Sequence, residues 1–189
     1  VSEKVISILE QMPIRIRKKV KEVTLDLAPT MERIARRTFP YAKLVSDRFH
    51  VQQLAGDAVQ QLRIEYRWEA IDQENKEIEF SKEIKKSYVP NILENGDTVK
   101  QLLARSRHLL FKQDTNWTPS QRQRAEILFQ YYPLLEKAYR LSRKLSYILS
   151  HTKEKGIGFT RLAQWYNEVE KSGLKTFGTV SRTIQNHYQ

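Results

Sequence analysis

Two aspartates and one histidine in the first third of the chain have residue types and spacing that suit a metal site. Asp26 stands at the end of the apolar run at residues 22–27, and Asp47 follows a second such run at residues 41–46. His50 comes three residues after Asp47. Carboxylate oxygens are the ligands that a hard cation such as Mg²⁺ prefers. The two acids would therefore suit a divalent metal if the fold brings them together.

The elements around the two acids predict that they meet. Residues of about 22–27 and 42–47 read as short strands, and residues 29–39 between them read as a helix. A strand–helix–strand unit gives parallel strands with a right-handed crossover in nearly all proteins. Ligands of open α/β sheets bind beyond the carboxyl ends of such strands. We therefore expect Asp26 and Asp47 side by side at one edge of a sheet.

Each acid also has a purely structural interpretation. Asp47 can cap the helix that follows it, and Asp26 can end its strand for reasons of turn geometry. Acids also gather in proteins for structural reasons alone. The residues by themselves leave both interpretations open.

Residues 23–29 and 39–51 together resemble the DDE transposases of bacterial insertion sequences, in particular the group commonly labelled ISL-three. The shared features are an acid at the end of an apolar strand, a short helix, a turn with Pro40 and Ala42, and the box Asp-Arg-Phe-His-Val at residues 47–51. Residues 104–110 and Trp165 also resemble the middle of these proteins. The resemblance spans most of the chain, and its specific part is residues 23–51.

The resemblance implies an RNase H-like core in which three acids hold two divalent metals. Such metals clamp the attacking and leaving oxygens while one DNA strand is cut and its 3′ hydroxyl is transferred. Asp26 matches the middle acid and is the first candidate metal ligand, with Asp47 as the second. Asp47 and His50 belong to the family box, for which we expect a supporting role.

The resemblance also implies the cofactor and the partners. Mg²⁺ or Mn²⁺ would serve the complete enzyme, and DNA, as transposon ends and as target, would be its partner. We expect a cytoplasmic bacterial protein, with a homo-oligomer in the full-length assembly and no membrane association.

The other two acids of the family have no match in the chain. Residues 1–21 hold only Glu3 and Glu10 as acids, and no Glu-x-x-Asn helix comes before Gln189. We therefore expect the chain, which begins at Val1, to be an internal fragment that is inactive alone and binds no metal tightly.

The composition favours a folded protein with phosphate-bearing partners. Of 189 residues 40% are hydrophobic, and 33 Lys and Arg against 22 Asp and Glu give a net charge of +11. Such a charge favours nucleic acid. The sequence has no run of about 20 apolar residues, so it predicts no membrane span. The lack of cysteine excludes disulfides and Cys-ligated zinc.

Basic residues on several predicted helices form the candidate DNA-binding surface. Each group alone is more simply a solvated helix face, but together they predict salt-dependent, sequence-independent affinity for the phosphate backbone. The candidates are Arg33, Arg36, Arg37, Arg48, Lys137, Arg140 and Lys144, with Arg105, Arg107 and Lys112 as a further group. Trp68, Trp117, Trp165, Tyr131 and Tyr132 could stack on bases, although aromatic residues at helical spacing more often belong to a core.

The predicted fold class is mixed α/β and mostly helical, with a partial RNase H-like core followed by a large all-α insertion. We assign the core to residues 1–72, including a long helix from about residue 48 to about residue 78. Residues 73–98 hold the helix end and a loop, and residues 99–189 the all-α region. Within that region, Thr118 and Gln121 predict a helix start, residues 156–158 a turn, and Gly173 a helix end.

Two other functions fit the same residues. The first is a non-catalytic, basic helical nucleic-acid-binding module. The second is a phosphoacceptor domain in which Asp26 or Asp47 receives phosphate, against which the lack of a companion lysine and of further strands argues. No glycine-rich phosphate loop occurs, and His50, His108, His151 and His187 are too far apart in sequence for a zinc motif.

Overall fold

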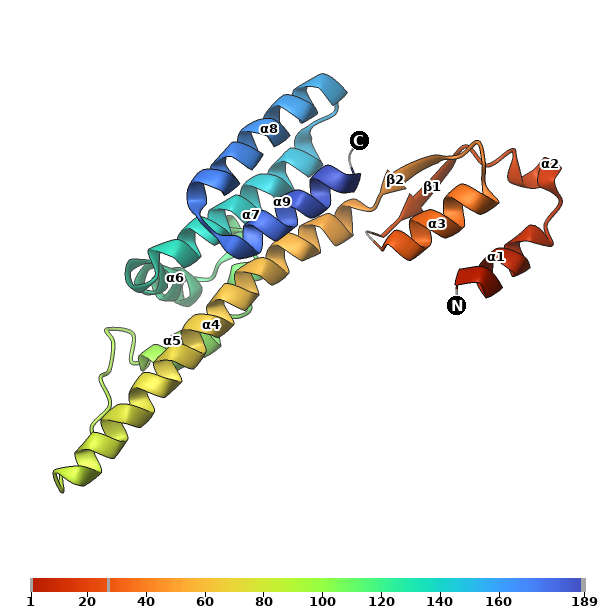
Figure 1. Cartoon of the computed structure of the whole chain (residues 1–189). Coiled ribbons are helices and arrows are strands. Elements are labelled where there is room, and N and C mark those ends of the chain that lie inside the picture. Colours follow the sequence, from red (N-terminus) through yellow and green to blue (C-terminus); the bar gives the residue numbers. More distant parts are fainter. Residues whose placement is uncertain (1, 27, 188–189) are drawn as a thin grey trace. The chain divides into compact units, whose positions relative to one another are not determined.

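The protein is described here by a computed structural model covering residues 2–26 and 28–187, without the side chain of His187. Helices dominate these residues, and two short strands form a parallel sheet (Figure 1). This confirms the predicted class, mixed α/β and mostly helical. In chain order the elements are α1 (Ser2–Glu10), α2 (Ile14–Arg17), β1 (Glu22–Leu25), α3 (Pro29–Thr38), β2 (Lys43–Ser46), α4 (Arg48–Glu83), α5 (Val99–Arg105), η1 (Leu109–Phe111), η2 (Asp114–Asn116), α6 (Pro119–Tyr131), α7 (Pro133–His151), α8 (Lys155–Ser172) and α9 (Lys175–His187).

The described part of the chain divides by its internal contacts into two compact units. One comprises Val1–Leu54 with Ser181–Gln189, and the other comprises Ala55–Val180. Helices α4 and α9 contribute residues to both units. No helix within the described ranges is both long and apolar enough to cross a bilayer.

The first unit is built around the β1–α3–β2 crossover. The parallel ladder runs from the pair Glu22↔Lys43 to the pair Leu25↔Ser46. Helix α3 starts with Pro29, which suits the first turn because its missing N–H would be unsatisfied there in any case. Its buried residues, Ile34, Ala35 and Thr38, lie on the helix that contacts both strands (Figure 1).

The two predicted strands are present but shorter than expected. The ladder covers residues 22–25 and 43–46 rather than 22–27 and 42–47. Asp26 leaves the first strand in a turn, and Leu27 lies outside the described residues. The first and last residues of the chain, Val1 and Gln189, lie outside them as well.

The second unit has its core between helices α7 and α8. Leu135, Ala138, Leu141 and Leu145 of α7 are all buried. Trp165 of α8 is fully buried, and its indole N–H donates to the Leu141 carbonyl at 2.9 Å. A buried indole N–H usually finds an acceptor, and this bond provides one while joining the two helices.

Helix boundaries in the second unit follow local chemistry, with one exception. Thr118 and Gln121 form the predicted capping box at the start of α6, and Gly173 ends α8 with φ 71°. The predicted turn at residues 156–158 is wrong, because these residues form the first turns of α8, which begins at Lys155. Each glycine costs a helix roughly 1 kcal/mol. The burial of Leu162, Trp165 and Val169 further along α8 offsets that cost.

The α7–α8 core predicts that alanine substitutions of two leucines on α7 differ greatly in their effect on the free energy of unfolding. Leu145 is fully buried, whereas the side chain of Leu134 is 47% exposed. Leu145→Ala should lower the free energy of unfolding by about 2–5 kcal/mol, because it leaves a cavity, and Leu134→Ala should lower it far less. Urea unfolding followed by circular dichroism measures both, and equal losses would contradict the assignment of this core.

Candidate metal-binding site

Asp26 and Asp47 occupy neighbouring positions at the carboxyl edge of the β1–β2 ladder. Leu25 and Ser46 are the last paired residues, and each acid follows one of them directly. The Asp47 amide donates to the Leu25 carbonyl at 2.7 Å, which extends the ladder by one bond. The backbone therefore places the two acids at the edge where the strand–helix–strand pattern predicted them.

The carboxylate of Asp26 is held by the turn that leads into α3. Its Oδ1 accepts a hydrogen bond from the Ala28 amide at 3.0 Å, two residues further along. Such a bond is the usual reason for aspartate in a turn of this type. It also fixes the orientation of the half-buried carboxylate, so the turn and the site share one side chain.

Asp47 stands at the N-terminus of α4 and interacts with His50. Its Oδ1 accepts from the Phe49 amide at 2.8 Å, which is the bond of a helix cap. Its Oδ2 lies 3.8 Å from Nε2 of His50. The positive end of the helix dipole favours a negative charge at this position. The capping interpretation of Asp47 therefore has direct geometric support, and the histidine lies beside the other oxygen.

A hollow of about 460 Å³ lies beside Asp47. Phe49 is 66% exposed, and its ring meets the ring of His50 edge to face at 5.7 Å between centroids. Sequence reasoning missed Phe49 as a surface residue, although its place inside the Asp-Arg-Phe-His-Val box was a signal. The lining of the hollow consists of Thr24, Val45, Ser46, Asp47, Arg48, Phe49 and Gln52.

The donor set at this edge fits part of a divalent-metal site. Mg²⁺ in phosphate-processing enzymes is commonly held by one or two carboxylates, with water and substrate phosphates completing the shell. Asp26 and Asp47 can provide the two carboxylates. Among the residues that the structure describes, no three His, Cys, Asp or Glu side chains come together as a ready ligand set.

The candidate arginines of α3 are paired with glutamates. Arg33 contacts Glu3 at 2.5 Å, and Arg37 lies 3.5 Å from Glu3 and 3.6 Å from Glu10, so α1 supplies acids to α3. Arg36 pairs with Glu32 one turn earlier on the same helix at 2.7 Å. All three arginine side chains are more than half exposed. Ion pairs this exposed are weak and exchangeable.

Most of the candidate basic residues of α7 and α5 also form ion pairs with acidic side chains. Arg140 pairs with Glu136 on α7, and Lys144 reaches Glu168 on α8 at 2.5 Å. Arg105 and Arg124 both contact Asp97, whose side chain is only 1% exposed. The Arg105 pair therefore has a structural role in holding the loop before α5. Lys137 is exposed on α7.

The three tryptophans have different environments. Trp165 is core, as expected for aromatic residues at helical spacing, and Trp117 packs between Phe129 and Tyr139. Trp68 is 61% exposed on α4, so the expectation of a core position is wrong for this residue.

The chain matches one protein-family model over nearly its whole length. The model is described as a transposase, for the ISL3 (ISL-three) group of the DDE type, and it covers residues 2–189. The chain belongs to this transposase family. No curated protein matches the chain, and no solved structure does. The match includes both acids and the whole box, and it agrees with the resemblance over most of the chain.

The box at residues 47–51 of this transposase lies directly after β2. The box at residues 47–51 supplies a helix cap in Asp47, a neighbour for its carboxylate in His50, and an exposed ring in Phe49. In this transposase the box is therefore an organised surface at the end of β2. The sequence analysis did not identify Glu3 and Glu10 as partners of the α3 arginines, although the two acids lie seven residues apart, a spacing that puts them on one face of a helix.

The cap at the start of α4 gives a test that separates the hydrogen bond of Asp47 from its charge. Asp47→Ala should lower the free energy of unfolding by about 1 kcal/mol, because the Phe49 amide loses its acceptor. Asp47→Asn should change it by only a few tenths, because asparagine caps about as well. Chemical unfolding of both variants measures the difference. Equal stabilities for the alanine and asparagine variants would show that the capping bond contributes nothing.

Proposed function

We propose that this chain carries the Asp26–Asp47 edge of the catalytic core of a DDE transposase, which cuts a DNA strand at a transposon end and joins it to a target. The observation that carries the proposal is the register of β1 and β2. In a chain that belongs to a transposase family, it places two carboxylates one residue beyond the last paired residues of parallel strands. That is the position at which α/β sheets bind their ligands.

Asp26 is the first ligand for Mg²⁺ or Mn²⁺ in this proposal, and Asp47 is the second. A bound cation of this kind supplies Lewis-acid stabilisation of the attacking and leaving oxygens in phosphoryl transfer. The Ala28 amide holds Asp26 in one orientation, and the Phe49 amide does the same for Asp47. Fixed carboxylates bind a cation with less loss of side-chain entropy than mobile ones. Further metal ligands would have to come from other residues, from water or from DNA.

His50 is a positioning residue in this proposal. Its Nε2 lies 3.8 Å from Oδ2 of Asp47, and its ring packs against Phe49. It therefore limits the directions in which the Asp47 carboxylate can turn. We do not assign it a proton transfer.

The arginines of α3 and the box, Arg33, Arg36, Arg37 and Arg48, are proposed contacts for the DNA backbone. The exposed glutamate partners of the α3 arginines can be exchanged for phosphates, to which arginine binds through paired, charge-assisted hydrogen bonds. Lys137, Arg140 and Lys144 are proposed for the same role on α7. Contacts of this kind position DNA without reading its sequence.

The non-catalytic alternative has specific support, because both acids make backbone bonds that a purely structural residue would make. A nucleic-acid-binding module would need the turn and the cap but not the negative charges. Asparagine keeps the acceptor oxygen and loses the charge, so it separates the two functions.

The test is Asp26→Asn in the full-length transposase, with Asp57→Asn, at an exposed position on α4, as the matched control. We expect strand cleavage at the transposon end to fall by at least about a hundredfold in the Asp26 variant, because asparagine lacks the negative charge that would bind the cation. The control should keep its activity. Cleavage assays on labelled DNA measure the loss, and circular dichroism with DNA-binding assays checks that fold and affinity are kept. Full cleavage by the Asp26→Asn enzyme would rule Asp26 out as a metal ligand.

A further inference from the structure

One line along α7 carries three basic side chains and then two rings. Its members, here called the α7 row, are Lys137, Arg140, Lys144, Tyr147 and His151. They follow one another at steps of three and four residues, which places them on one face of the helix. The buried apolar residues of α7, which contacts α8, lie on the other side of the helix. The α7 row therefore faces away from the core of the second unit.

The last two members of the α7 row form an exposed stack of rings. The rings of Tyr147 and His151 lie 4.5 Å apart between centroids and only 14° from parallel. Nδ1 of His151 lies 3.2 Å from the Tyr147 carbonyl oxygen, a contact that holds the imidazole beside the phenol ring. Tyr147 is 56% exposed, and His151 is exposed as well. The pair therefore presents π surface to solvent instead of filling a core.

The surroundings of this ring stack are positively charged. Helix α7 holds four lysines or arginines and a single glutamate, which gives it a net charge of +3. Arg140 pairs with Glu136, and Lys144 pairs with Glu168. The side chains of these two glutamates are 32% and 47% exposed, so the pairs are weak and phosphates can replace the glutamates.

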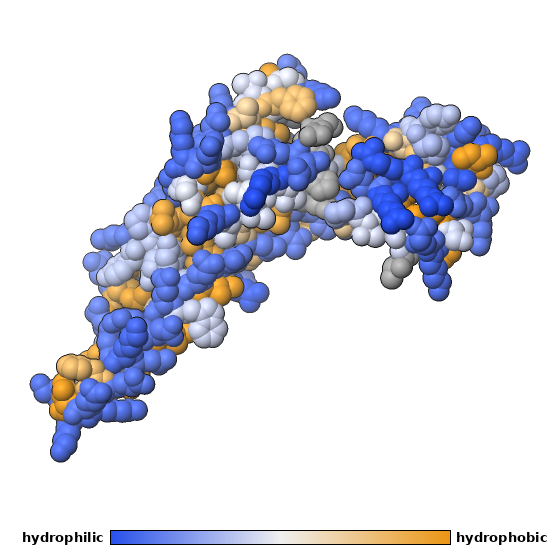
Figure 2. All heavy atoms as spheres, in the orientation of Figure 1, coloured by the Kyte–Doolittle hydropathy of each residue, from blue (hydrophilic) through white to orange (hydrophobic). Residues whose placement is uncertain are grey.

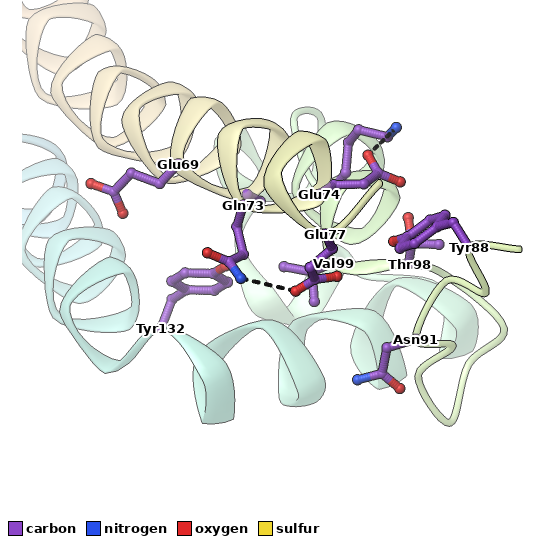
Figure 3. Close-up of a pocket in the computed structure, with 11 residues that line it drawn as sticks. Glu69, Gln73, Glu74, Glu77, Tyr88, Asn91, Thr98, Val99 and Tyr132 are labelled. Atoms are coloured by element: carbon purple, nitrogen blue, oxygen red, sulfur yellow. Dashed lines mark hydrogen bonds and ion pairs between the residues drawn. The ribbon is translucent and has the colours of Figure 1, made fainter. Parts of the chain in front are cut away.

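Other aromatic surfaces of the same unit are acidic. Apolar patches break the hydrophilic surface along the far part of α4 (Figure 2), but residues 64–84 hold seven acidic residues against three basic ones. The pocket beside Tyr88 and Tyr132 is lined by three glutamates and one lysine (Figure 3). Negative charge of this kind repels a phosphate backbone. The α7 row instead joins exposed rings to positive charge.

Rings and basic side chains along one line are the combination that binds single strands of nucleic acid. Basic side chains follow the phosphates, and bases stack on aromatic rings, since every base has a π face. Bases inside a duplex are already stacked on both faces, so an exposed ring pair can take an unpaired base or a strand end. From Lys137 to Tyr147 the α7 row spans about 15 Å, a length that a few nucleotides can follow.

We propose that the α7 row binds single-stranded DNA, with an unpaired base stacked on the Tyr147–His151 pair. The inference rests on the proposed function in naming DNA as the partner, because a cut strand can separate from its complement at a transposon end. Lys137, Arg140 and Lys144 bind the phosphates of that strand. Stacking on rings tolerates any base, so the row holds the strand without reading its sequence.

Fluorescence anisotropy with labelled oligonucleotides tests this binding, with the whole chain against a single strand and against a blunt duplex. Tyr147→Ala should weaken binding of the single strand about tenfold, because the stacked base loses its ring, and should leave duplex binding within about twofold. Tyr147→Phe keeps the ring and should bind the single strand as the wild type does. The control is Phe80→Ala, at a ring that is 60% exposed on the acidic part of α4, and it should change neither affinity.

The salt dependence of the same binding separates stacking from charge. Tyr147→Ala should lower the affinity for the single strand without changing the slope of log K against log salt concentration, because no phosphate contact is lost. The double variant Lys137→Gln with Arg140→Gln should reduce that slope by about 1.4, at about 0.7 for each phosphate contact in a single strand. An equal change of slope in Tyr147→Ala would show that the residue acts through charge or folding, and would overturn the proposal.

Three further results would also overturn it. They are equal affinity of the wild type and Tyr147→Ala for the single strand, equal losses by Tyr147→Ala for single strand and duplex, and no affinity of the chain for the single strand. Circular dichroism checks that each variant keeps its helical content. The assay measures binding without cleavage, so its failure leaves the cleavage test of Asp26→Asn standing, and the two proposals can fail separately.

Discussion

The hydrogen bond from the Asp47 amide to the Leu25 carbonyl is the constraint on which the rest of the candidate site depends. It extends a ladder of only four residue pairs by one step and sets the register of both strands at their carboxyl ends. A shift of one residue would turn each side chain to the opposite face of the sheet. The two acids are neighbours because the crossover through α3 leaves the strands parallel and this bond fixes where each one ends.

Both acids make a hydrogen bond that stabilises the local fold. Each gives one carboxylate oxygen to a backbone amide, Asp26 at the start of α3 and Asp47 at the start of α4. Those bonds stabilise the helix starts and hold one oxygen of each carboxylate in place at the edge where the ladder ends. A carboxylate that is already held by a backbone bond loses less side-chain entropy when it binds a cation. The structural and catalytic interpretations of these residues are therefore compatible.

The sequence was informative where local chemistry decides the structure. The β1–α3–β2 pattern, the capping box at Thr118 and the helix end at Gly173 were all predictable, because each depends on a few neighbouring residues. The glycines at residues 156 and 158 were misleading, because tertiary packing of α8 outweighed their low helix propensity. The exposure of Trp68 and the pairing of Arg33 and Arg37 with Glu3 depend on which helix faces come together. Periodicity along one helix carries no such information.

Binding of Mn²⁺ to the chain, followed by electron paramagnetic resonance, tests the central claim most directly. We predict weak, millimolar binding, because two carboxylates are an incomplete ligand set. Asp26→Asn and Asp47→Asn should each weaken it further, while Asp57→Asn should leave it unchanged. Binding that neither asparagine variant alters would contradict the account, since the two acids would then not form a common metal site.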